Sequence, residues 1–150
     1  MLSATFELEA VIDQHLAGLK AMLKEKMAYK PSPAKWSKKE IIGHMIDSAQ
    51  NNIRRFIVAQ YEDNPHIVYK QDNWVSLSNY QNYDITDLVN LRYLLNKHLV
   101  IVLKNMQPEM LQRKCRTESE HTIEWLAHDY VRHLRHHLHQ VLEIDPVPYP

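Results

Sequence analysis

The chain has 150 residues, enough for one domain with a substantial hydrophobic core, and we treat residues 1–150 as that domain. Only two residues are glycine, which favours helices over a turn-rich β-protein. Acidic and basic side chains balance to zero formal net charge, which argues against a nucleic-acid partner. No run of about 18 apolar residues occurs, so we expect no membrane span and no membrane partner.

The N-terminal residues and the cysteine content bear on the compartment. Glu7, Glu9 and Asp13 stand where a secretory signal would be apolar. The single cysteine, Cys115, excludes an intramolecular disulfide, and we expect it in a polar loop without a nucleophilic role. The sequence therefore predicts a cytoplasmic protein.

The first predicted helix covers residues 3–27 and ends before Pro31. Its apolar residues recur at steps of three and four, with charged residues between them. This is the period of an amphipathic helix. The apolar positions are Leu8, Ile12, Leu16, Leu19 and Leu23.

The second predicted helix covers residues 38–60 and begins at a capping box formed by Ser37 and Glu40. On a helical wheel, a polar stripe lies opposite the apolar stripe. This polar stripe either faces solvent or forms one wall of a cleft, if another segment covers it. Its members are Glu40, His44, Asp47, Ser48, Asn51 and Arg55.

Residues 61–83 form a long connection that is rich in aromatic residues and has no sustained helical period. A connection of this length inside a compact domain is usually functional or disordered, and its aromatic content argues against disorder. If it crosses the mouth of a bundle with Trp74 packed inward, it covers the polar stripe. Trp74 is alternatively a simple core anchor.

Two further helices are predicted at residues 86–106 and 123–144, the last with Thr122 as its N-cap. A polar segment separates them, and residues 145–150 are too rich in proline for a helix, so we expect them extended on the surface. Four amphipathic helices with one long crossover between the second and third predict an all-α four-helix bundle.

Histidines are concentrated in the last predicted helix. His133 and His137 lie one turn apart at the border of its apolar stripe, whereas His128 and His139 fall on the far side. Two imidazoles at this spacing can bind one metal ion, although solvated histidines on an exposed face have the same spacing. A metal site would need a third ligand from elsewhere in the chain.

Three stretches resemble motifs of the DinB-like (YfiT-type) superfamily. The first reads W-S-x-x-E-I-I-G-H-x-x-D-S from Trp36 and continues as N-N-x-R-R-F from Asn51. The second reads Y-x-x-D-x-W-V from Tyr69, and the third H-x-x-H-H-x-x-Q from His133. The resemblance covers nearly the whole chain in the right order. It implies a four-helix bundle with a metal site whose ligands are His44, His133 and His137, while His136 matches a position not usually assigned as a ligand.

The resemblance also implies a chemistry. Characterised members are similar to metal-dependent transferases that add a low-molecular-weight thiol to an electrophile, and others are described as hydrolases. We therefore expect a metal-dependent enzyme acting on a small-molecule substrate, with a non-catalytic, stress-related metal-binding bundle as the alternative.

Particular residues follow from this expectation. Three imidazole ligands suit Zn²⁺ or Ni²⁺ equally. Asp47 is a candidate for proton handling or for orienting a ligand, or is only a polar neighbour. Asn51, Arg55 and Trp74 are candidate substrate contacts, or face water. The sequence leaves the oligomeric state open, with a homodimer as one alternative.

Overall fold

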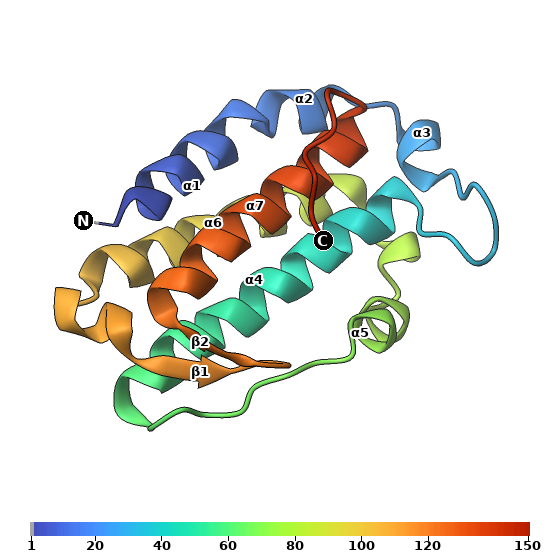
Figure 1. The fold of residues 1–150 in the computed structure, drawn as a ribbon. Helices are drawn as coiled ribbons and strands as arrows, with labels where there is room; N and C mark the ends of the chain where they lie inside the picture. The colour runs from blue at the N-terminus through green and yellow to red at the C-terminus, as the bar shows by residue number, and fades with distance from the viewer. Residues whose placement is uncertain (1) are drawn as a thin grey trace.

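The computed structural model describes residues 2–150, which are mostly helical (Figure 1). The bundle consists of α1 (Ser3–Gln14), extended by α2 (Leu16–Ala21), and the long helices α4 (Lys38–Tyr61), α6 (Ile85–Asn105) and α7 (Ile123–Leu142). Helix α4 packs against α6 and α7, and α1 packs against the same two helices from the other side. The predicted all-α four-helix bundle with a long crossover is confirmed. Within residues 2–150, no helix is both long and apolar enough to cross a membrane.

Side-chain caps define where the long helices begin. Ser37 and Glu40 form the predicted capping box of α4: the Ser37 hydroxyl accepts from the Glu40 amide at 3.2 Å, and Glu40 Oε1 accepts from the Ser37 amide at 3.0 Å. Asp84 caps α6 and Thr122 caps α7. Each side chain accepts a hydrogen bond from the backbone amide three residues further along the chain. These caps satisfy backbone donors that have no partner inside a helix. The predicted starts at 38, 86 and 123 therefore lie within one residue of the observed ones.

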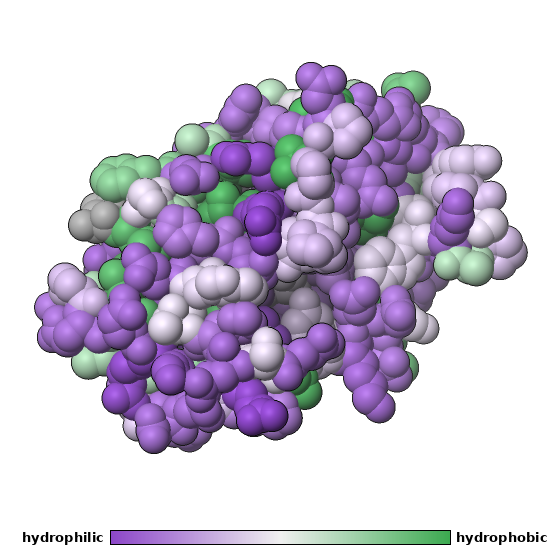
Figure 2. All heavy atoms as spheres, viewed as in Figure 1, coloured by the Kyte–Doolittle hydropathy of each residue, from purple (hydrophilic) through white to green (hydrophobic). Residues whose placement is uncertain are grey.

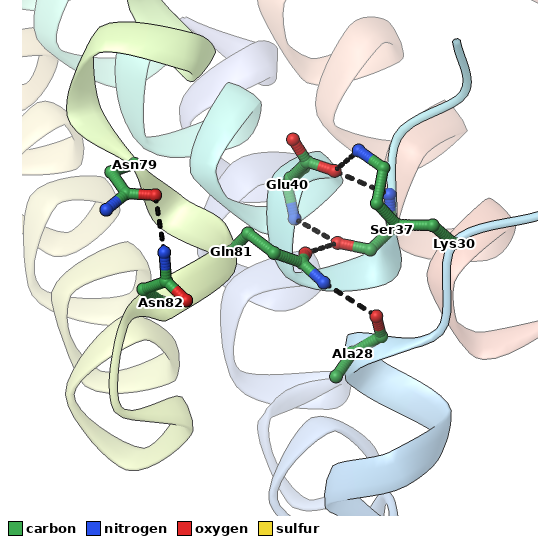
Figure 3. A network of polar contacts seen from close by, with 7 residues as sticks. All are labelled: Ala28, Lys30, Ser37, Glu40, Asn79, Gln81 and Asn82. Carbon is green, nitrogen blue, oxygen red and sulfur yellow. Dashed lines mark hydrogen bonds and ion pairs between the residues drawn. The ribbon is translucent and has the colours of Figure 1, made fainter. Parts of the chain in front are cut away.

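The capping box also belongs to a larger polar network (Figure 3). The Ser37 hydroxyl pairs with the side chain of Gln81, whose amide donates to the Ala28 carbonyl at 2.7 Å. Lys30 donates to Glu40 Oε1 at 2.5 Å. This network ties the crossover to the start of α4.

The prediction of one helix over residues 3–27 is wrong in detail, because the chain breaks twice into α1, α2 and α3 (Lys24–Ala28). His15 separates α1 from α2, and Met22 and Leu23 have extended backbone. After the second break, Leu23 is 70% exposed, whereas Met27 is fully buried. The break turns the chain so that Met27, rather than Leu23, continues the core.

The crossover contains a helix that its lack of periodicity did not predict. Helix α5 (Gln71–Ser78) is followed by the 3₁₀ turn η1 (Tyr80–Asn82), with Asn79 between them in the left-handed conformation at φ 57°. Val75 and Tyr80 take the buried positions, while Trp74 is 37% exposed. The inward packing expected of Trp74 is therefore not observed, because its neighbour Val75 faces the core.

A short hairpin separates α6 from α7, after the 3₁₀ turn η2 (Pro108–Gln112). Strands β1 (Lys114–Arg116) and β2 (Glu120–Thr122) pair antiparallel. The expectation of a polar loop around Cys115 is wrong, since Cys115 is fully buried in β1 and its thiol donates to the Pro65 carbonyl at 3.3 Å. The backbone of Arg116 exchanges hydrogen bonds with Pro65 and Ile67, which fastens the crossover to the hairpin.

Residues 145–150 are extended, as predicted, but they fold back along α7 (Figure 1). Helix α7 ends at Leu142, and the C-cap residue Glu143 has a left-handed φ of 56°. His139 and His136 then donate from Nδ1 to the carbonyls of Asp145 and Val147, both at 2.6 Å. We call residues 145–150 the strap.

Candidate metal centre

Three histidines from two helices converge at one point in the bundle. His133 and His137 lie one turn apart on α7, and the packing of α4 against α7 brings His44 to them. His133 Nε2 lies 3.1 Å from the Nε2 atoms of both His44 and His137. The ligand atoms of all three lie within 4.8 Å of one another. The structure thus brings together the three residues that the sequence motifs named.

The polar stripe of α4 is covered, so its interpretation as a solvent face is wrong. His44 is only 1% exposed, and Asp47, Ser48 and Asn51 are also buried. Part of the cover is the ring of Trp36, whose centroid lies 4.9 Å from that of His44. Helix α7 and the crossover supply the rest, since α4 packs against α7, α5 and η1.

Burial keeps these imidazoles neutral. It lowers the pKa of His44 to about 3, with the charge of His137 as a smaller cause. Burial, followed by the neighbouring histidines, lowers the pKa of His133 well below its ordinary value. Burial also lowers the pKa of His137, whereas its hydrogen bond to the Gln140 side-chain oxygen raises that pKa. Neutral imidazole is the form that carries a lone pair for a metal.

The contacts among the three rings suit a cation better than hydrogen bonds alone. A ring nitrogen carries either one hydrogen or one lone pair, so His133 Nε2 cannot make two linear hydrogen bonds at once. One cation accepts lone pairs from all three nitrogens. Tetrahedral Zn²⁺ with imidazole ligands separates them by about 3.3 Å, close to the observed separation from His133. The donor set therefore fits a divalent transition metal.

The outer nitrogens support this orientation. His137 Nδ1 lies 3.0 Å from Gln140 Oε1, a contact that requires hydrogen on Nδ1 and leaves the lone pair on Nε2. His133 Nδ1 lies 3.5 Å from the Ser48 hydroxyl. Among the described residues, His44 Nδ1 has no hydrogen-bond partner.

Asp47 is fully buried and lies outside the group formed by the three histidines. Its Oδ1 accepts from the Tyr80 hydroxyl at 2.5 Å, and its Oδ2 has no partner among the described residues. Burial raises the pKa of Asp47 to about 6, although the hydrogen bond from Tyr80 acts in the opposite direction. The contact to η1 places this carboxyl between α4 and the crossover.

Two cavities reach the histidine cluster, and Gln71 belongs to the lining of both. One, of about 340 Å³, is lined by His133 and opens on the face drawn in Figure 2, where a hollow lies beside the strap. The other, of about 390 Å³, is lined by His137 and His136. We call them the His133 cavity and the His137 cavity. Polar and aromatic side chains of the His133 cavity include Ser48, Asn52, Arg55, Tyr69, His121, Trp125, Asp129 and Tyr149.

Of the three candidate substrate contacts, one lines a cavity and two do not. Arg55 lines the His133 cavity, with its guanidinium donating to the Ile67 carbonyl at 3.1 and 3.0 Å. Asn51 donates to the backbone carbonyl of Asp47 and lines neither cavity. Trp74 packs edge-on to Tyr69 and also lines neither.

Sequence reasoning did not identify several cavity residues. His121 stacks flat on Trp125, with ring centroids 3.6 Å apart, and Tyr149 reaches the cavity from the strap. His121 and Tyr149 stand on the hairpin and the strap, which lack a helical period, whereas Trp125 lies on α7. Their aromatic character was the only signal. The exposed His128 lies outside the cluster, as predicted.

Comparisons with known proteins agree with this architecture. The family model of the DinB superfamily matches residues 7–141. Among solved structures, YfiT from Bacillus subtilis, described as a probable metal-dependent hydrolase with an unusual four-helix bundle topology, superposes with a TM-score of 0.84 at 21% sequence identity. The match covers 93% of this chain and 82% of that one. No curated protein sequence matches the chain. The chain belongs to the DinB superfamily.

Proposed function

We propose that the chain is a metal-dependent enzyme that transfers a low-molecular-weight thiol to a small electrophile, or hydrolyses a small substrate, at His44, His133 and His137. The convergence of three neutral Nε2 atoms between two cavities is the observation that carries this proposal. A divalent ion held by them, Zn²⁺ or Ni²⁺, supplies Lewis-acid chemistry that makes water or a thiol nucleophilic near pH 7.

Two separate cavities favour transfer over hydrolysis. Transfer joins two organic reactants, and each needs its own path to the reaction centre. The His133 and His137 cavities lead to different rings of the same cluster. Reactants that occupy these two neighbouring cavities are held close together without competing for one pocket, and this proximity lowers the entropic part of the barrier.

Arg55 is the proposed anchor for an anionic group on one reactant. A guanidinium has five N–H donors. Two of its nitrogens donate to the Ile67 carbonyl and a third approaches Asn52 Oδ1 at 3.4 Å, so two N–H groups stay available. Asp129 is an acidic side chain of the same cavity, and its carboxylate already accepts a hydrogen bond from the Tyr149 hydroxyl. Asn51 and Trp74 are not proposed as substrate contacts. Asn51 supports the packing of α4, and Trp74 supports the packing of the crossover.

Asp47 is proposed as a positioning residue. Its carboxyl holds Tyr80 and hence η1 against α4 one turn from His44. We expect Asp47→Asn to retain metal, because the amide oxygen can still accept from Tyr80.

The test compares holo protein, metal-free protein and His133→Ala in a thiol-consumption assay. The assay offers cysteine, glutathione or bacillithiol with chlorinated or epoxide electrophiles. We expect metal-dependent thiol loss, about one divalent ion per chain, and loss of that ion on substitution of any cluster histidine by Ala. His128→Ala is the matched control, since His128 is exposed and outside the cluster.

The alternative function is a non-catalytic metal-binding bundle. In that case metal removal lowers the thermal midpoint, because the ion ties α4 to α7. Thiol loss would then be equal in the holo, metal-free and His133→Ala proteins across the panel, and this result would refute thiol transfer as the function.

A further inference from the structure

We propose that Tyr149 is a specificity-determining residue of the His133 cavity, which the strap closes on one side. This inference rests on the proposed function, because selectivity has meaning only if a reactant enters this cavity. Tyr149 is the strap residue that lines this cavity, and it does so beside His133 of α7. It belongs neither to the histidine cluster nor to the motifs that identify the family.

Tyr149 is held in place at both the ring and the hydroxyl. Its ring lies edge-on to that of His133, with centroids 5.1 Å apart, and the Arg132 guanidinium lies 5.7 Å from its centroid. The hydroxyl donates to Asp129 Oδ2 at 2.8 Å. Burial raises the pKa of Tyr149, so the phenol keeps its hydrogen and remains a donor at neutral pH. The ring thus forms a fixed wall beside a cluster histidine.

The strap backbone is held separately from the ring. The carbonyls of Asp145 and Val147 accept from His139 and His136, each at 2.6 Å. Pro146 and Pro148 restrict φ on either side of Val147, which limits the freedom lost when the strap docks. Shortening the Tyr149 side chain should therefore open the wall without releasing the strap.

The effect should be confined to one cavity. Tyr149 lines the His133 cavity and not the His137 cavity. A reactant that enters beside His133 should be accepted in a larger form once the ring is removed. The reactant that enters beside His137 should keep its KM. A general loosening of the bundle would change both.

The variants are Tyr149→Ala, which removes the wall, and Tyr149→Phe, which keeps the ring and loses the hydroxyl. Tyr61→Ala is the matched control, because Tyr61 is 68% exposed at the end of α4. Benzyl bromide and 2-(bromomethyl)naphthalene present the same reactive group at two sizes, with cysteine as the thiol. We expect Tyr149→Ala to shift the kcat/KM ratio about tenfold toward the larger electrophile. Tyr149→Phe and Tyr61→Ala should keep the wild-type ratio.

A second measurement does not depend on activity. Diethyl pyrocarbonate modifies accessible imidazoles, and mass spectrometry of metal-free protein assigns the modification to single residues. We expect modification of His133 to rise several-fold in Tyr149→Ala, relative to the exposed His98 of the same sample, and to stay at the wild-type level in Tyr149→Phe. Zn²⁺ transfer from loaded protein to a chromogenic chelator should also accelerate in Tyr149→Ala.

The outcomes separate this inference from the proposed function. Unchanged modification of His133 together with an unchanged selectivity ratio in Tyr149→Ala would overturn the role of Tyr149. Equal thiol loss with and without metal in the wild-type protein would instead refute thiol transfer as the function, whatever the modification experiment gives.

Discussion

Substitution of Gly43 by alanine should destabilise the bundle, although alanine is the better helix former. Gly43 lies inside α4, next to His44, and the ring of Tyr80 occupies the space a side chain would take. A Cβ at this position would lie 2.0 Å from Tyr80 Cδ2 and 2.3 Å from Cγ. Carbon atoms pack best at about 3.5–4.0 Å, so the ring must move by about 1.5 Å.

The size of the destabilisation follows from one stabilising and two destabilising effects. Alanine gains about 1 kcal/mol of helix propensity over glycine. Overpacking a buried site costs about 1–3 kcal/mol. Loss of the hydrogen bond from Tyr80 to the buried Asp47 carboxyl costs about 1.5–3 kcal/mol more. We therefore expect a net loss of about 1.5–5 kcal/mol, which lowers the thermal midpoint by roughly 3–20 °C for a chain of this size.

Urea denaturation of metal-free protein followed by circular dichroism measures this loss. Gly18→Ala is the control, because its Cβ would meet only the two terminal carbons of the Leu142 side chain, at 3.2 and 3.9 Å. The gain in helix propensity should leave stability unchanged or slightly raised. In a Tyr80→Ala background, Gly43→Ala should cost much less, since the obstructing ring is absent. Equal stability of Gly43→Ala and wild type would refute the close approach of Tyr80 to α4.

Three further predictions follow from burial and capping. Ser37→Ala should lower the free energy of unfolding by about 1–2 kcal/mol in urea denaturation, because the α4 cap and the Gln81 contact are both lost; an unchanged midpoint would contradict the cap. Cys115 should react with a thiol reagent only after unfolding, since it is fully buried, and rapid labelling of the folded protein would contradict this. The cluster histidines have lower pKa values in the folded protein than in the unfolded chain. The stability that they contribute to metal-free protein is therefore present above about pH 6.5 and is lost as the pH falls. Each histidine can lower the free energy of unfolding by up to about 1.4 kcal/mol per pH unit. A flat stability profile between about pH 7 and about pH 5 would argue against their burial.

The helices that carry the cluster could be predicted from sequence because their ends have local chemical signals. Ser37 and Thr122 act within four residues of the chain, so no tertiary information is needed to place these starts. The first helix lacked such signals at its breaks. Leu23 continued the apolar period, yet the chain buries Met27 instead.

The site could be predicted only in part, because a helical wheel shows which residues share a face and not what covers that face. His44 and Asp47 were placed together correctly, but the wheel could not distinguish solvent from a cleft. The motif resemblance supplied His44 as a third ligand. The cavity residues His121 and Tyr149 stand on the hairpin and the strap, whose positions are fixed by tertiary contacts between segments distant in sequence.

The two parts of the site rest on different kinds of backbone. The cluster histidines stand on α4 and α7, whose backbone hydrogen bonds and buried contacts resist change, whereas Tyr69, His121 and Tyr149 stand on the crossover, the hairpin and the strap. Loops tolerate substitution and insertion better than the helices they connect. On the proposed function, reactivity and substrate choice can therefore diverge separately: exchanging these three segments should redirect the protein to new substrates while the affinity for the ion stays nearly constant.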